Sequence, residues 1–249
     1  MRHALFALLL LLTPLTLAAA PRSGHDDAGL SIQAMQDDDT QNPGMLWVAQ
    51  GEAMWDANAG TGQRCASCHG AITAMRGVAA RYPAWDPTQN RPLSLWQRIN
   101  HCRTDHQGAE ALDVESDAML SLTAALGHQS RGMPVSIATD GPMAEVIETG
   151  RRLHQTRQGQ LNLSCAQCHD DLAGHHLAGS RIPQGHGNGY PEYRLEWQTL
   201  GSLWRRVRNC LTGVRATPYA ADSAEMVAIE AYLAARAQGL NVETPAVRP

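Results

Sequence analysis

Two Cys-X-X-Cys-His motifs are the residues most able to do chemistry in this 249-residue sequence: Cys65-Ala-Ser-Cys68-His69 and Cys165-Ala-Gln-Cys168-His169. This spacing is the attachment signature of c-type haem, because the two thiols bond one porphyrin while the adjacent histidine reaches its iron. A zinc site or a redox disulfide also uses Cys-X-X-Cys, but neither needs a histidine directly after the second cysteine. We therefore predict two covalently bound haem c groups, with His69 and His169 as iron ligands.

The elements around these motifs form a repeat, because the chain runs through one pattern twice. Tyr82-Pro83 is matched 108 positions later by Tyr190-Pro191, and residues 95–102 are matched at the same offset by residues 203–210. Apolar residues in both longer segments recur at spacings of three and four, which predicts helices, whereas strand-like alternation is scarce. We predict a mainly α fold with two tandem cytochrome c-like haem domains, the first over residues 43–139 and the second over residues 140–249.

The N-terminal region has the features of an export signal. A basic start is followed by an apolar run and then by small residues, which predicts a signal peptide over residues 1–20 with cleavage near 18–20. The polar stretch 21–42 is predicted to be flexible. No later segment is apolar for long enough to span a bilayer, so we expect no membrane insertion. The net charge of −4 gives no reason to expect a nucleic-acid partner.

Methionine is the usual distal ligand of c-type cytochromes, but it does not serve both copies here. The first copy has Met133-Pro134, whereas the matching positions of the second copy are Leu240-Asn241. Met119 and Met226 do correspond, yet both lie in apolar helical stripes, which favours a role in the core.

Cysteine is the one ligand type that recurs at an equivalent place beyond the motifs, as Cys102 and Cys210. His101 beside Cys102 is replaced by Asn209 in the second copy, so histidine is not an iron ligand that both copies could use at this position. A disulfide between the two cysteines is the alternative, since spare thiols in an oxidising compartment usually pair. Their matched positions instead favour thiolate ligation of each iron, which would give both haems low reduction potentials.

The segment before Cys210 is rich in arginine. Arg206 lies four residues before Cys210, hence one turn away on the same helix face. A guanidinium suits a small divalent oxyanion, because it offers forked donors and a permanent charge. We predict that Arg206 faces the sulfur and that Arg205 and Arg208 form a solvated edge. The first copy has only Arg98 before its cysteine and Arg103 after it.

Taken together, these motifs resemble the SoxA family. The resemblance rests on the two haem motifs, on Arg-Asn-Cys-Leu-Thr-Gly-Val-Arg-Ala at 208–216 and on the ending Gly-Leu-Asn-Val-Glu-Thr-Pro-Ala-Val-Arg at 239–248. It extends from about Trp47 to the C-terminus. It implies two His/Cys-ligated haems, a periplasmic location and a SoxX-type monohaem cytochrome c as partner in a heterodimer.

The resemblance also implies an enzyme, an L-cysteine S-thiosulfotransferase. Such an enzyme conjugates thiosulfate oxidatively to a cysteine of the SoxYZ carrier protein and passes two electrons to a downstream c-type cytochrome. Cys210 would be the catalytic sulfur, and Arg206 and Arg236 would be its active-site arginines. From the residues alone, two other functions stay open: a diheme electron-transfer cytochrome c without sulfur chemistry, and a diheme peroxidase with one displaceable distal ligand.

Overall fold

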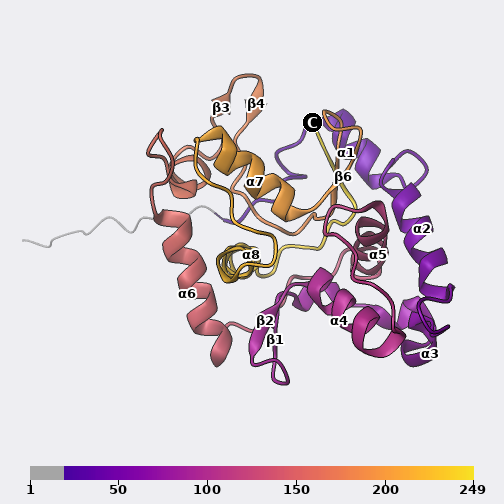
Figure 1. Cartoon of the computed structure of the whole chain (residues 1–249). Helices are drawn as coiled ribbons and strands as arrows, with labels where there is room; N and C mark the ends of the chain where they lie inside the picture. The colour runs from indigo at the N-terminus through magenta and orange to yellow at the C-terminus, as the bar shows by residue number, and fades with distance from the viewer. Residues whose placement is uncertain (1–19) are drawn as a thin grey trace, which may run out of the picture.

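The structure is a computed structural model that describes residues 20–249, so the predicted signal peptide lies outside the described residues except for Ala20. Helices dominate these residues, as predicted, and the strands are short (Figure 1). Between residues 20 and 249, no helix combines the length and apolar character needed to cross a membrane.

The element order shows the repeat directly. The first copy contains α2 (Met45–Asp56), α3 (Cys65–His69), η1 (Ile72–Met75), η2 (Ala79–Arg81), β1 (Ala84–Asp86), β2 (Arg91–Leu93), α4 (Leu95–Gln107) and α5 (Asp117–His128). The second copy contains α6 (Pro142–Gln155), η3 (Gln167–Asp171), β3 (His176–Leu177), β4 (Ser180–Arg181), β5 (Glu192–Arg194), β6 (Thr199–Gly201), α7 (Leu203–Gly213) and α8 (Ala224–Arg236). The hairpin β3–β4 has no counterpart in the first copy, and it follows directly after the second haem motif.

One helix pair in each copy crosses at a glycine. A Cβ atom added to Gly51 of α2 would lie 2.1 Å from the carbonyl oxygen of Ser121 in α5. A Cβ atom added to Gly150 of α6 would lie 1.9 Å from the carbonyl oxygen of Ala228 in α8. Only glycine permits such a close backbone approach. The two copies therefore share a helix crossing that fixes the elements on either side of each haem motif.

The two copies are related by an approximate two-fold axis. Pro134 and Asn241, which are equivalent residues at an offset of 107 positions, pair with each other in an antiparallel bridge. The hydrogen bonds around this bridge come in matched pairs: Gly132 N to Val242 O with Gly239 N to Val135 O, and Val135 N to Leu240 O with Val242 N to Met133 O. Exchanging each residue for its equivalent turns one bond of a pair into the other, which is the signature of a two-fold relation.

The copies also share their core. One cluster packs Val48, Leu120 and Ala124 of the first copy against Leu200 and Val247 of the second. A second cluster joins residues 80, 135 and 137 to residues 237 and 242. Figure 1 accordingly shows the helices of the first copy on one side and those of the second on the other, with no open linker between them. The repeats thus form one folded unit.

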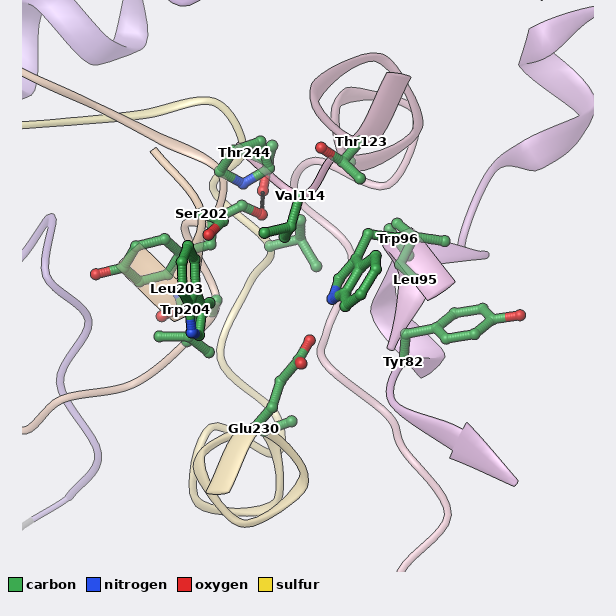
Figure 2. Close-up of a pocket in the computed structure, with 18 of the residues that line it drawn as sticks. Tyr82, Leu95, Trp96, Val114, Thr123, Ser202, Leu203, Trp204, Glu230 and Thr244 are labelled. Atoms are coloured by element: carbon green, nitrogen blue, oxygen red, sulfur yellow. Dashed lines mark hydrogen bonds between the residues drawn. The ribbon is translucent and has the colours of Figure 1, made fainter. Parts of the chain in front are cut away.

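A cavity of about 130 Å³ lies where the repeats meet. Equivalent residues line it from both sides, among them Trp96 with Trp204. Figure 2 shows the Glu230 carboxyl, carried by α8, entering the space between these two indoles. Its Oε2 lies 2.5 Å from the Ser94 hydroxyl, and burial raises the pKa of Glu230 to about 7. A single buried carboxyl therefore connects the second repeat to the first.

The segment 21–42 is ordered, and the prediction that it is flexible was wrong. It contains α1 (Leu30–Asp37), which packs on the C-terminal strand β7 (Ala246–Arg248), itself parallel to β5. Gln36 accepts a hydrogen bond from Val247 N at 3.0 Å, and Asn42 donates one to Pro245 O at 2.9 Å. Both of these polar side chains are buried. Long-range hydrogen bonds therefore order a segment whose composition is polar.

Serine residues start the main helices of both copies. Ser202 accepts a hydrogen bond from Arg205 N at the start of α7, and Ser94 takes the equivalent place at the start of α4. Ser223 caps α8 by accepting from Met226 N. These hydroxyls satisfy backbone donors that have no partner within their helix. They thereby fix where the helices that carry Cys102, Cys210 and Arg236 begin.

Candidate haem and anion site

The second Cys-X-X-Cys-His motif presents its histidine in a form suited to bind iron. His169 Nδ1 lies 2.8 Å from the carbonyl oxygen of Pro183, which can only accept, so Nδ1–H donates and Nε2 is left as the ligand atom. Burial lowers the pKa of His169, and the charges of Arg206 and Arg236 lower it further. A neutral imidazole with a fixed tautomer is the state that a metal requires.

Helix α7 carries Cys210 and Arg206 one turn apart, as predicted. Burial acts to lower the pKa of Arg206, but the negative charges of Cys210, Tyr190 and Glu192 outweigh burial and raise that pKa. Between residues 20 and 249, no carboxylate lies within 4.0 Å of its guanidinium and no side-chain hydrogen bond is formed to it. The charge of Arg206 is therefore available to an anion beside the Cys210 sulfur.

Arg236 reaches the same site from the end of α8. Its guanidinium forms an ion pair with Asp170 at 2.7 Å and donates to the carbonyl oxygen of Gln184 at 3.1 Å. Asp170 directly follows His169, so this pair anchors the end of α8 to the haem motif. Arg206 and Arg236 thus come from separate helices, and both act on the charge of the same histidine.

A pocket of about 380 Å³ opens beside His169 and Arg236. His186 also lines it, and burial lowers the pKa of His186 to about 4, with Arg236 as a further cause. The N-terminal segment covers the pocket: Pro21 lines it, and Arg22 N donates to Gln184 Oε1 at 2.7 Å. Asp170 also lines the pocket and pairs with Arg236, so the pocket contains one ion pair beside two histidines whose pKa values are lowered.

A further buried histidine, His154 of α6, was not singled out by the sequence. It is 1% exposed and lies 3.8 Å from Asp170, with its ring 5.2 Å from that of Tyr232. Burial lowers the pKa of His154 to about 4. His154 is the equivalent of Trp55 in the first repeat, because Gly51 and Gly150 are separated by the same 99 positions. Aligning the repeats at this offset could have identified His154 from the sequence.

The first repeat builds a different environment around its motif. The Trp55 ring lies 5.7 Å from that of His69, and its indole N–H donates to Gly70 O at 2.9 Å. The Cys65 sulfur accepts a hydrogen bond from the side chain of Gln107. Cys102 lies on α4, where burial raises the pKa of its thiol although Arg98 acts to lower it. An aromatic side chain therefore stands here where the second repeat has the buried His154.

The number of arginines is not the main difference between the two helices, contrary to the prediction from the sequence. Arg98 lies four residues before Cys102 and is the equivalent of Arg206 at an offset of 108. The difference lies in the partner: Arg98 forms an ion pair with Asp86 at 2.6 Å, whereas Arg206 has no such partner within the described residues. The repeat offset could have identified both arginines, but not their pairing.

The neighbouring arginines of α7 are held by tryptophans. Arg205 lies 4.2 Å above the Trp197 ring and forms a 3.7 Å ion pair with Glu115 of the first repeat, so it is part of the contact between repeats. Arg208 stacks on Trp204 at 4.9 Å and is exposed, in line with the predicted solvated edge. Both guanidinium groups therefore contact other side chains in this structure.

The alternative ligands take other places. Cys102 and Cys210 are free thiols on helices of different repeats, so the structure contains no disulfide between them. Met119 and Met226 are 0% and 2% exposed, which confirms that they belong to the core. Met133 lies against Gly77, with its Cε 3.0 Å from the position of a Cβ atom added there.

Comparison with known proteins identifies close relatives. The family model described as SoxA/TsdA, cytochrome c domain, matches residues 50–135 and residues 149–242. The SoxA subunit of L-cysteine S-thiosulfotransferase from Rhodovulum sulfidophilum is 42% identical over 91% of this chain and 80% of its own length. The corresponding subunit from Pseudaminobacter salicylatoxidans is 40% identical over 94% of this chain and 85% of its own length.

A solved structure shows the same fold. The crystal structure of SoxXA from P. pantotrophus superimposes with a TM-score of 0.89 at 36% identity, covering 92% of this chain and 87% of that chain. The match spans both repeats, because 92% coverage leaves too few residues for either repeat to be missing.

Proposed function

Because this chain belongs to the SoxA/TsdA cytochrome c family, we propose that it is the haem-carrying subunit of an L-cysteine S-thiosulfotransferase. The enzyme conjugates thiosulfate oxidatively to a cysteine of a SoxYZ-type carrier protein in sulfur oxidation. The observation that carries this proposal is the unpaired Arg206 one turn from Cys210, with Arg236 acting on the same histidine.

Covalent haem c fits the residues of both motifs. His169 has its Nδ1–H committed to Pro183 O, so its Nε2 would bind iron, and Cys165 and Cys168 would form the thioether bonds. In the first repeat, Cys65, Cys68 and His69 would hold a second haem, since α3 presents the same motif. Cys102 and Cys210 would each supply a further ligand to one of the irons. When bound, haem c supplies a centre that accepts and releases one electron at a time.

The side chains of the second repeat divide the work of the reaction. Arg206 and Arg236 bind the sulfonate oxygens of thiosulfate by charge-assisted hydrogen bonds and orient its sulfane sulfur toward Cys210. The Cys210 thiolate and the sulfane sulfur form an S–S bond, and two electrons leave toward c-type cytochrome. The carrier's cysteine thiolate then attacks the sulfane sulfur, so that the thiosulfate group is transferred and Cys210 is released as a thiolate.

We place the reaction in the periplasm, where the predicted signal peptide would deliver the chain. A SoxX-type monohaem cytochrome c is the partner in a heterodimer, as the name of the similar SoxXA complex indicates. A downstream cytochrome c would take the electrons.

Matched variants of the two repeats test this function. Cys210→Met or Arg206→Leu should abolish thiosulfate-dependent reduction of cytochrome c, while Cys102→Met or Arg98→Leu should leave at least part of it. Haem content, measured as the pyridine haemochrome, should stay unchanged in all four. Equal turnover by the Cys210→Met variant and the wild type would refute a catalytic role of this sulfur and favour plain electron transfer. Peroxide-dependent oxidation of reduced cytochrome c would favour a peroxidase.

A further inference from the structure

The repeats differ in the residue that ends the first strand of the β-hairpin before the helix carrying Arg98 or Arg206. In the first repeat, this residue is Asp86, the last residue of β1. Its carboxylate is 2% exposed and lies 2.6 Å from the Arg98 guanidinium. Its other oxygen accepts from the backbone N–H groups of Thr88 and Gln89 at 2.8 Å and 3.1 Å. Asp86 is therefore fixed in place and neutralises Arg98.

In the second repeat, the residue equivalent to Asp86 is Arg194, the last residue of β5. The charge at this position is reversed. Arg194 forms ion pairs with Glu192 at 3.1 Å and with Glu196 at 2.9 Å. The Glu192 side chain is 6% exposed, whereas that of Glu196 is 53% exposed, so Glu192 is the buried carboxylate of this pair. Both glutamates lie close enough to Arg206 to raise its pKa, yet neither forms an ion pair with it.

A buried carboxylate that loses its cationic partner is strongly destabilised unless it finds another one. Arg206 is a cation near Glu192, since the negative charge of Glu192 helps to raise the pKa of Arg206. A carboxylate paired with Arg206 would compete with an anionic substrate for the same donors. The ion pairs of Arg194 thus prevent this competition in the second repeat, and Asp86 imposes it in the first.

We propose that Arg194 is a positioning residue that holds Glu192 and Glu196 away from Arg206, so that Arg206 stays available to thiosulfate. In the first repeat, Asp86 pairs with the equivalent Arg98 and thereby prevents an anion from binding there. The inference rests on the proposed function, since it concerns the same Arg206. It explains why two equivalent Arg-X-X-X-Cys helices offer one anion site.

Calorimetric titration of thiosulfate into the reduced heterodimeric holoprotein, which cannot accept the two electrons of conjugation, tests the proposal without turnover. Wild-type protein should bind one thiosulfate. Arg194→Gln should raise the dissociation constant for thiosulfate about tenfold, because Glu192 would then pair with Arg206. The double variant Glu192→Gln with Arg194→Gln should recover to within about threefold of wild type. A purely structural role of Arg194 would not be rescued by removal of Glu192.

The control is Arg151→Gln, which breaks an exposed Arg–Glu pair of the same repeat at 2.6 Å from Glu148 and should not change binding. Wild-type affinity in a folded Arg194→Gln variant, or no recovery in the double variant, overturns the proposal. If Arg194→Gln does not fold, Asp86→Asn decides: it should raise the stoichiometry from one thiosulfate to two, and a stoichiometry of one overturns the proposal.

The same titration separates this inference from the proposed function. Arg206→Leu should lose thiosulfate binding. If Arg206→Leu binds thiosulfate like the wild type, the proposed anion site itself is wrong. If Arg206→Leu loses binding while Arg194→Gln keeps wild-type affinity, only the positioning role of Arg194 is refuted.

Discussion

Replacing Glu230 by glutamine should remove a pH-dependent loss of stability at the contact between the repeats. The Glu230 carboxyl enters the cavity between Trp96 and Trp204 (Figure 2). Ser94 is its hydrogen-bond partner at 2.5 Å. Burial raises its pKa from an ordinary value of 4.5 to about 7, although the hydrogen bond from Ser94 acts to lower it. The glutamine amide can accept the same hydrogen bond from Ser94 without carrying a charge.

The sign of the effect follows from proton binding. Between pH 4.5 and about 7, the folded protein keeps the Glu230 proton while the unfolded chain has lost it, so stability falls as the pH rises through this interval. Below pH 4.5 both states are protonated and the penalty is absent. A pKa shift of one unit corresponds to about 1.4 kcal/mol. The raised pKa of Glu230 therefore lowers the free energy of unfolding by about 3 kcal/mol, and this full loss is present above pH 7.

Urea unfolding of the wild type and of Glu230→Gln at pH 5 and pH 8 measures this penalty. Between pH 5 and pH 8, the free energy of unfolding should fall by about 2–3 kcal/mol more in the wild type than in Glu230→Gln, because all other titrating groups are common to both. Glu148→Gln is the control, since this exposed carboxylate has its pKa lowered by Arg151 and does not titrate in the interval. Equal pH dependence of the wild type and Glu230→Gln would refute the assignment of a protonated carboxyl to this cavity.

Three further perturbations test the fold around the site. Gly150→Ala should lower the free energy of unfolding by about 3 kcal/mol, at the upper end of overpacking effects, because the new Cβ would lie 1.9 Å from the Ala228 carbonyl oxygen. Thermal unfolding measures this loss, and an unchanged midpoint would contradict it. Gln36→Ala should release α1 from β7, seen as faster hydrogen exchange over residues 30–37, and unchanged exchange would mean that other contacts suffice. Deleting residues 20–24 should expose the pocket beside His169, with faster exchange at residues 184–186, whereas wild-type protection there would show that the segment is not its cover.

Local spacing predicted the parts of this protein that local chemistry determines. The haem motifs, the helices that carry Cys102 and Cys210, and the one-turn relation of Arg206 to Cys210 follow from sequence distances that a helix converts into geometry. The offset of 108 likewise predicted the repeat, because duplicated segments keep their spacing.

Long-range contacts determine the remaining features, which no local pattern could predict. Residues 21–42 look flexible by composition, yet Gln36 and Asn42 bond to a strand more than 200 residues away. Likewise, Arg98 and Arg206 occupy equivalent helix positions four residues before a cysteine, yet only Arg98 forms an ion pair with its neighbouring hairpin, through Asp86. Pairing of buried charges is a property of the fold.

Three differences between the repeats near the haem motifs share one direction. Trp55, Gly70 and Gln129 of the first repeat correspond to His154, Asp170 and Arg236 of the second, so the second repeat has an ionisable group at each of these places. Polar groups are costly to bury, and a site that served only to hold a cofactor would gain by replacing them with apolar ones. Their concentration beside His169 therefore supports the proposal that the second repeat binds an anionic substrate.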